Sequence, residues 1–409
     1  MHLFLRSSGL LLVVTLAACG GSSGSGRDPA LRTEIRDSAG IRIVDNVLPS
    51  EPVVWRRLAD APSVVIPPGE GDDALLRVAG AERMRDGSFL VATLRGSFLM
   101  RFGPDGRFQG VLARRGSGPG ELRSIDGFLR RGIDTVVVWD PITARLSTFT
   151  PEGLVESRSL AGRVQFALAG VAGEFAPGHL LLRERGAPGP LMRRGDGLVR
   201  DTTALLLLRI AGEEPAESLL TLPGIKVILL SQEVNGQMMP GMAASPDYHD
   251  AWAVTGEGRG FVVNADAVDI RVLDSTGLRE RWTLAVTPVS VGDAEIGALK
   301  ATIAEIYGET VLQAWEPIWA SVPPPSVRPA VAGILRSRDG TLWVERYSLV
   351  TDSIRLYHVF DTDGAHVGDV TVPRRFKVLS ADRDWVLGVS RDEDGLESVE
   401  LYSLIAPTR

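Results

Sequence analysis

Cysteine is almost missing from this chain of 409 residues, because Cys19 is the only one. A single thiol excludes intrachain disulfides and any metal site built from several thiolates. Lysine is scarce too, since the 44 basic residues include only Lys226, Lys300 and Lys377 besides arginine. Alanine and glycine are abundant, so we attribute the excess of arginine to a GC-rich genome and do not read it as a sign of phosphate binding.

Positive charge is not in excess, because 51 acidic residues outnumber the 44 basic ones and give a formal net charge of −7. The charges are scattered along the sequence, so we expect no nucleic-acid partner. Hydrophobic residues make up 44% of the chain. This fraction allows a substantial core and excludes disorder throughout.

Motifs for catalysis are missing as well. Outside the glycine- and serine-rich stretch at residues 20–26, the sequence contains no G-x-S-x-G elbow for a hydrolase nucleophile. Its histidines stand at positions 2, 179, 249, 358 and 366, without the i, i+4 spacing of helical metal ligands. His358 alternates within an apolar strand, as an ordinary core or surface residue does, whereas His249 lies in a polar segment between acids. We therefore predict no catalytic residue and keep His249 as a candidate for an interaction surface, with a simple turn as the alternative.

Long apolar runs are absent from the N-terminus. Residues 10–16 are apolar, but a transmembrane helix needs about 20 such residues. The run follows Arg6 and ends in LAAC at residues 16–19, which is the layout of a signal peptide. A cleavage site that ends in cysteine resembles the lipobox of bacterial lipoproteins, which implies that Cys19 is acylated. A plain secretory peptide with an unmodified Cys19 is the alternative.

These features predict three segments. Residues 1–18 are expected to be a lipoprotein signal peptide, residues 19–34 a lipid-anchored linker rich in glycine and serine, and residues 35–405 the folded body. By resemblance to sorting in two-membrane bacteria, Gly20 after the cysteine favours the outer membrane. The predicted location is the bacterial cell envelope, and the predicted membrane contact is the lipid anchor.

The body of the chain is a repeat. An alternating strand followed by a turn that closes on glycine occurs at residues 102–106, 149–153, 273–277 and 360–364. Each such turn predicts a β-hairpin, because glycine supplies the positive φ that closes it. A second turn, followed by an unbroken apolar run, precedes each copy at residues 86–91, 132–139, 257–263 and 339–344. Such a run is typical of a strand buried on both faces.

The spacing of the hairpins predicts a six-bladed β-propeller. The first two copies lie 47 residues apart and the last two 87, close to two periods of about 43 residues, the length of a propeller blade. We expect blades at residues 78–112, 128–160, a degenerate third blade through residues 179–182 and 204–210, then 252–284, 334–372 and 376–404. The last holds three strands. The fourth is expected from the N-terminus, at residues 40–45, 53–58 or 64–66, so that both termini close the ring.

The loop RGSGPGEL at residues 115–122 resembles the glycine-rich crossover between blades in NHL-type repeats. Together with DSAGIRIV at residues 37–44 and DGTLWV at residues 339–344, it is similar to a largely uncharacterised family of bacterial six-bladed β-propeller lipoproteins. The resemblance implies the fold and export and implies no reaction. A phosphate cradle is the alternative for the loop, but a Walker loop needs Gly-Lys-Ser/Thr where Pro119 and Glu121 follow.

A segment unlike the repeat separates blades four and five. Apolar residues at positions 296, 299, 303 and 306 predict an amphipathic helix, which Gly308 ends or bends. We expect a helical insertion over residues 290–322, and Trp315 and Trp319 within it are candidates for an interaction surface. The insertion is either a lid that only packs on the propeller or a binding edge.

Two functions remain open from the sequence. The first is a binding or scaffold module for an unknown protein or small-molecule ligand, without a cofactor. The alternative is a metal-dependent hydrolase or lyase with its site in the central channel. Propeller enzymes that resemble gluconolactonase hold a divalent metal there with acid and amide side chains from different blades. No metal ligand can be named from this sequence. Converging acids or amides in the channel favour the enzyme, and an apolar or arginine-lined plug favours the module.

Overall fold

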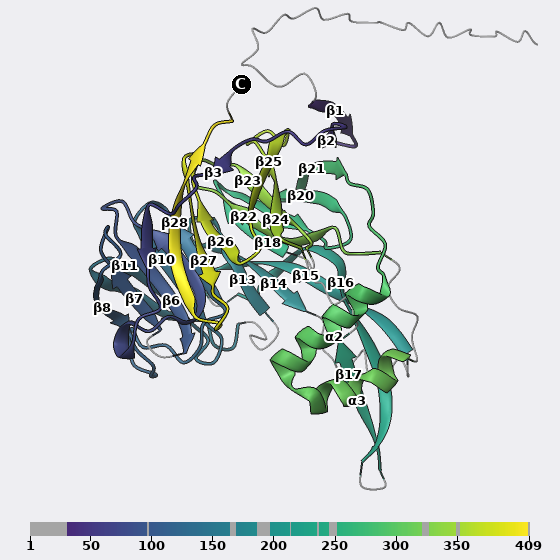
Figure 1. The fold of residues 1–409 in the computed structure, drawn as a ribbon, viewed down its shortest axis with the longest axis horizontal. Helices are drawn as coiled ribbons and strands as arrows, with labels where there is room; N and C mark the ends of the chain where they lie inside the picture. Colours follow the sequence, from purple (N-terminus) through teal and green to yellow (C-terminus); the bar gives the residue numbers. More distant parts are fainter. Residues whose placement is uncertain are drawn as a thin grey trace, which may run out of the picture.

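The computed structural model describes residues 31–407, apart from residues 96–97, 164–168, 186–196, 213, 235–236, 245–251, 321–326 and 349–351. Its strands form six sheets that surround a central axis, each sheet being one blade (Figure 1). The predicted all-β, six-bladed propeller is confirmed. In this part of the chain, no helix combines the length and the apolar character that crossing a membrane requires.

Three blades are four-stranded antiparallel sheets close to the predicted ranges. Blade one contains β5 (Leu76–Arg83), β6 (Phe89–Arg95), β7 (Leu99–Phe102) and β8 (Phe108–Ala113). Blade two contains β9 (Gly127–Arg131), β10 (Thr135–Asp140), β11 (Arg145–Thr150) and β12 (Gly153–Ser159). Blade five contains β22 (Val331–Arg336), β23 (Leu342–Arg346), β24 (Ile354–Phe360) and β25 (His366–Pro373).

Blade three is larger than predicted. It has five strands: β13 (Ala169–Ala176), β14 (His179–Arg185), β15 (Gly197–Arg209), β16 (Glu217–Val234) and β17 (Gln237–Ala244). The 18 residues of β16 pair first with β15 and then with β17. The β16–β17 hairpin therefore projects from the ring (Figure 1). The sequence expectation of a degenerate blade was wrong because this blade is extended, and its extension does not follow the repeat.

Blade four gains a hairpin from the N-terminus. Its own strands are β18 (Trp252–Gly256), β19 (Arg259–Val263), β20 (Val268–Asp274) and β21 (Gly277–Ala285). Next to β21 lie β2 (Ile41–Val47), in parallel, and β1 (Arg32–Ser38). Residues 40–45 are therefore not the strand missing from blade six.

Blade six is closed by both ends of the chain. Its three C-terminal strands are β26 (Phe376–Ala381), β27 (Trp385–Arg391) and β28 (Glu397–Ile405). The N-terminal strands β3 (Arg57–Leu58) and β4 (Val64–Ile66) pair antiparallel with β28. Of the three candidate segments, residues 53–58 and 64–66 thus supply the closure. The prediction that strands from both termini close the ring is confirmed.

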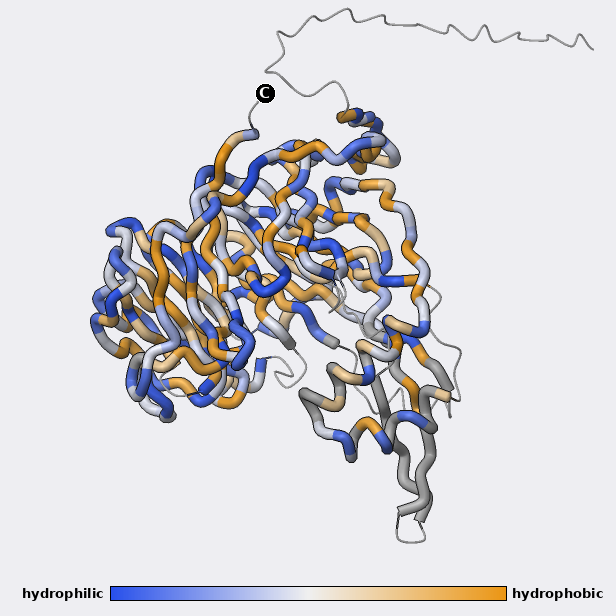
Figure 2. The backbone as a smooth tube through the Cα atoms, viewed as in Figure 1, coloured by the Kyte–Doolittle hydropathy of each residue, from blue (hydrophilic) through white to orange (hydrophobic). Residues whose placement is uncertain are grey.

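The core is divided among the six blade interfaces. Six clusters of buried apolar side chains each join one pair of neighbouring blades, including blades six and one. This arrangement explains the unbroken apolar runs of the second strands, because a strand inside a blade packs against both neighbours. In Figure 2 hydrophobic residues follow the strands and hydrophilic ones gather at the turns. The first strand of each blade is the innermost, and these strands contact one another around the channel.

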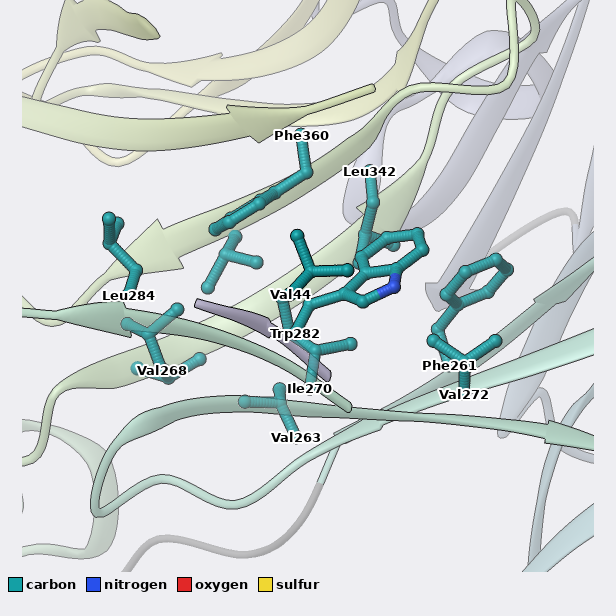
Figure 3. Close-up of a cluster of buried hydrophobic side chains, with 12 residues drawn as sticks. Val44, Phe261, Val263, Val268, Ile270, Val272, Trp282, Leu284, Leu342 and Phe360 are labelled. Carbon is teal, nitrogen blue, oxygen red and sulfur yellow. The ribbon is translucent and has the colours of Figure 1, made fainter. Parts of the chain in front are cut away.

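The N-terminal strand β2 enters the core between blades four and five. Val44 is fully buried beside Trp282 in this cluster (Figure 3). Gly364, at the end of a predicted turn, has a φ of 87°, and a Cβ there would lie 2.5 Å from the Trp282 indole. Glycine is required at this position for its backbone conformation and for this close approach.

The helical insertion lies between blades four and five, as predicted. Helix α2 (Asp293–Tyr307) is followed by α3 (Glu309–Ala320), with Gly308 between them at a φ of 92°. The N-cap is Gly292, whose backbone N–H donates to Glu295 Oε2 at 3.1 Å. The short 3-10 helix η1 (Gly71–Asp73) precedes blade one.

Candidate functional site

A pocket of about 370 Å³ opens at one mouth of the central channel. The innermost strands all run in the same direction, so their carboxyl ends meet at this mouth. The pocket lies over the ends of β9, β13, β18 and β22 and over the turns that follow them. Its walls therefore come from four blades, two to five. Three of the four repeated turns that the sequence analysis found before second strands line the pocket, at Gly132, Gly258 and Gly340.

Arginine is the dominant charged residue of the mouth. Four arginines and two glutamates line the pocket: Arg130, Arg131, Arg336, Arg338, Glu174 and Glu257. The chain as a whole carries a net charge of −7, so the sign of the mouth is opposite to that of the protein. A concave, poorly solvated surface with one sign of charge concentrates the electric field and attracts ions of the other sign.

A buried ion-pair network centred on Glu82 of β5 adjoins the pocket through Arg130 and Arg338. Glu82 is only 7% exposed, and its Oε2 accepts hydrogen bonds from Arg338 Nη2 at 2.8 Å and from Ser380 Oγ at 3.0 Å. Arg130 Nε lies 3.8 Å from Glu82 Oε1. The guanidinium of Arg338 also faces the Trp385 ring, 5.4 Å from its centroid. This network joins blades one, two, five and six, and two of its members, Arg130 and Arg338, also line the pocket.

The carboxylates that line the pocket are paired with arginines. Glu174 Oε2 lies 2.5 Å from Arg131 Nε, and Glu257 Oε2 lies 3.5 Å from Arg336 Nη2. A divalent metal needs several carboxylate or amide oxygens that converge on one point. Among the described residues of this mouth, the carboxylate oxygens face arginine nitrogens and do not converge on one point. The side chains that line the pocket therefore do not fit a divalent metal ion. Of the two arrangements that the sequence analysis contrasted, converging acids or lining arginines, the described residues of the mouth present the arginines.

Arg336 is the most buried cation at the site. Its side chain is 4% exposed, and its Cζ lies 4.7 Å from the centroid of the Phe261 ring. Burial above all, together with the charges of Arg259 and Arg130, lowers the pKa of Arg336 to about 10, while Glu257 and Asp339 act in the opposite direction. The guanidinium therefore sits in an environment that disfavours its own charge.

A second polar cluster lies inside blade five, away from this pocket. Asp369 Oδ1 is 2.8 Å from His358 Nδ1 and 2.9 Å from His366 Nε2, and all three residues are buried. Burial would raise the pKa of Asp369, but the hydrogen bonds from both imidazoles outweigh it and lower the pKa. These are the described residues whose ligand atoms come close enough together to hold a metal ion. Both nitrogens are already engaged by one oxygen, which is the geometry of a shared hydrogen-bond acceptor.

The residues singled out in the sequence do not form this pocket. The backbones of Trp315 and Trp319 lie in α3, whereas His249 and Cys19 fall outside the described residues. The insertion returns to the ring at the start of β22, since the backbone N–H of Arg328 donates to the carbonyl of Val289 at 2.7 Å. Arg336 ends the same strand, about 17 Å from its first residue at 3.3 Å per residue. The insertion and the arginine-rich mouth thus lie at opposite ends of β22.

The sequence analysis missed the arginines of the mouth because it attributed them to overall composition. A local signal was present: Arg130 and Arg131 directly precede the turn at Gly132, and Arg336 and Arg338 precede the turn at Gly340. In a propeller, the turns after the innermost strands meet around the channel. A comparison of the residues at equivalent positions before these turns would have predicted that the arginines cluster at the channel mouth.

A comparison with solved structures supports the fold. No protein-family model and no curated protein matches the chain. Among solved structures, a member of the DUF4221 family from Bacteroides vulgatus is 9% identical, covers 87% of this chain and 99% of its own, and has a TM-score of 0.50. A protein of Bacteroides fragilis, provisionally described as exported, is also 9% identical, over 90% of this chain and 100% of its own, with a TM-score of 0.47. At these identities the likeness concerns the fold alone.

Proposed function

We propose that the protein is a lipid-anchored binding module of the bacterial cell envelope, and that it takes a small-molecule ligand at the mouth of the channel. The observation that carries this proposal is the pocket of about 370 Å³ walled by four blades and adjoined by a buried ion-pair network that shares Arg130 and Arg338 with it. Ligand pockets of about this size, with a few fixed polar groups, are typical of small-molecule sites. The rigid ring holds those groups in place before a ligand arrives.

The envelope location in this proposal is supported by the sequence. The charged start, the short apolar run and the LAAC motif that ends at Cys19 match a lipoprotein signal, and Gly20 favours the outer membrane. Diacylglycerol together with an N-acyl chain is sufficient for stable attachment. Cys19→Ser should move the protein from the membrane fraction to the soluble fraction. If the variant stays with the membrane, the anchor part of the proposal is wrong.

The ligand site can be tested with a substitution that fills the pocket without changing any charge. Ala176 lines the pocket, so Ala176→Trp should obstruct it, while Val155→Trp on an exposed position of an outer strand is the matched control. Each protein is mixed with an aqueous small-molecule extract of bacterial cells and desalted, and the molecules retained are identified by mass spectrometry. We expect wild type and Val155→Trp to retain the same compound and Ala176→Trp to lose it. Retention by all three proteins, or by none, contradicts a ligand site at the mouth.

A further inference from the structure

The buried guanidinium of Arg336 lacks a full set of partners. Its Nη1 atom is buried and has no hydrogen-bond partner among the described residues. The carboxylate that it approaches, Glu257, lies 3.5 Å away and is 67% exposed, so water competes for it, and Asp339 attracts its charge without a hydrogen bond between the two. Buried polar groups in proteins are nearly always hydrogen-bonded, and a charged group left without a partner is costly. Arg336 therefore has unused capacity for an anion.

The surroundings of Arg336 add positive charge. The charges of Arg259 and Arg130 act unfavourably on its protonated form, and Arg131 and Arg338 line the same pocket. Like charges gathered in a poorly solvated cavity repel one another, and an anion placed among them removes that repulsion. The ion pairs of Arg131 with Glu174 and of Arg338 with Glu82 leave Arg336 and Arg130 as the less compensated cations.

The backbone leaves room for the guanidinium. A Cβ at Gly256 would lie 3.2 Å from Arg336 Cγ and 3.2 Å from its Nε. The absence of a side chain at Gly256 thus lets Arg336 lie against the Phe261 ring within the pocket wall. Contact with the ring holds one face of the planar group, while its edge carries the N–H donors. A fixed, planar fork of donors suits a carboxylate or a phosphate.

We propose that the channel mouth binds a small molecule through an oxyanion group, a carboxylate or a phosphate, which the guanidinium of Arg336 contacts with support from Arg130. This inference rests on the proposed function, because it names the chemical class of the ligand taken at the same pocket. The alternative is a purely structural role, in which Arg336 only packs on Phe261 and stabilises the contact between blades four and five. The two roles differ in what happens to anion binding when the side chain is changed.

The test is isothermal titration of the purified protein with citrate and, separately, with inorganic phosphate at low ionic strength. We expect at least one of the two anions to bind, with an affinity that falls as salt is added. Arg336→Lys keeps the charge but loses the fork, and should weaken binding by about tenfold or more. Arg130→Gln, at a more exposed position, should also weaken binding and covers the case in which Arg336→Lys does not fold. Arg114→Gln removes an exposed arginine paired with Asp72 and should leave binding unchanged.

The outcomes separate this inference from the proposed function. If the compound retained from the cell extract is neutral or cationic and Ala176→Trp still blocks it, the pocket is the site and the oxyanion class is wrong. Equal anion affinity in folded Arg336→Lys, Arg130→Gln and wild type also overturns the inference and leaves Arg336 with a packing role. If no compound is retained by the wild type and neither anion binds, both the function and the ligand class fail.

Discussion

At the scale of single residues, the shared carboxylate of Asp369 shows how the fold creates an interaction across a hairpin. His358 lies opposite Asp369 in the β24–β25 register, while His366 follows the turn, three residues before it. One oxygen accepts from both imidazoles at 2.8 and 2.9 Å in a buried position where water cannot replace either bond. The negative charge of Asp369 is thus stabilised by its two neighbours, and it stabilises the hairpin in return.

Asp369→Asn should lower the free energy of unfolding at pH 7 by about 1–3 kcal/mol, because buried hydrogen bonds to a charged acceptor are lost. The pKa of Asp369 is lowered in the folded state, so its contribution is present above the ordinary carboxyl pKa and disappears as the pH falls through the folded value. Urea unfolding at pH 7, 5 and 3.5 should therefore show a difference between variant and wild type that shrinks toward acid. Asp394→Asn, at an exposed turn, is the control and should match wild type. A constant difference at every pH would contradict this account.

Single-sequence reasoning could not find this group or the arginine-rich mouth. The turn at residues 360–364 was predicted correctly, but the partners of His358 depend on the register after that turn, including a shift between Val359 and Phe360. The mouth gathers residues from four blades, and their distances are set by ring closure and not by spacing along the chain. The period of the repeat, its hairpins and the number of blades follow from local turn chemistry, and they could therefore be predicted from the sequence.

At the scale of elements, the two ends of the helical insertion lie next to each other and are joined by backbone contacts. The strands that flank it are tied together below it, since Arg328 N–H donates to the carbonyl of Val289 and Ser290 forms a β-bridge with Val327. Lys300 Nζ and Glu316 Oε1, 2.8 Å apart, join the two helices to each other. The path of the chain through blades four and five therefore does not depend on α2 and α3.

Replacing residues 291–326 with a short glycine linker should leave the propeller folded. The ends to be joined are already neighbours, so the loop-closure entropy changes little, although the Arg328–Glu295 ion pair is lost. We expect a cooperative thermal transition and a melting temperature within a few degrees of wild type. Ligand retention at the channel mouth should survive the deletion. Loss of a co-purifying protein partner, with the mouth still active, would support the insertion as a separate binding edge; unchanged partners would leave it as a lid.

At the scale of the whole molecule, stability depends on the closure of the ring. Ile66 of β4 is 1% exposed and belongs to the cluster that joins blades six and one. The short strands β3 and β4 cover the edge of β28, which would otherwise expose unpaired backbone groups. The N-terminal segment is thus part of the domain and more than a connector to it.

A chain that begins at residue 68 should be much less stable than one that begins at residue 31. The truncation removes β1 to β4, opens the interface between blades six and one, and takes Val44 out of the interface between blades four and five. We expect loss of a cooperative unfolding transition, or aggregation through the exposed edge of β28, measured by circular dichroism and gel filtration. The chain from residue 31 is the control. A folded, monomeric protein from residue 68 would show that the ring closes without its N-terminal strand.

The hairpin of β1 and β2 also determines how the propeller responds to a pull on its N-terminus. Load applied ahead of residue 31 reaches β1 first, and Arg32 and Val47 form the open end of that hairpin. The pairs from Arg32 to Ser38 then separate one after another, as in a zipper, before any load reaches β2. Because β1 is largely exposed, its release costs little core packing and adds about 2 nm of chain at 3.3 Å per residue. In a chain held ahead of residue 31, we therefore expect the outermost strand to detach first and the ring to stay folded.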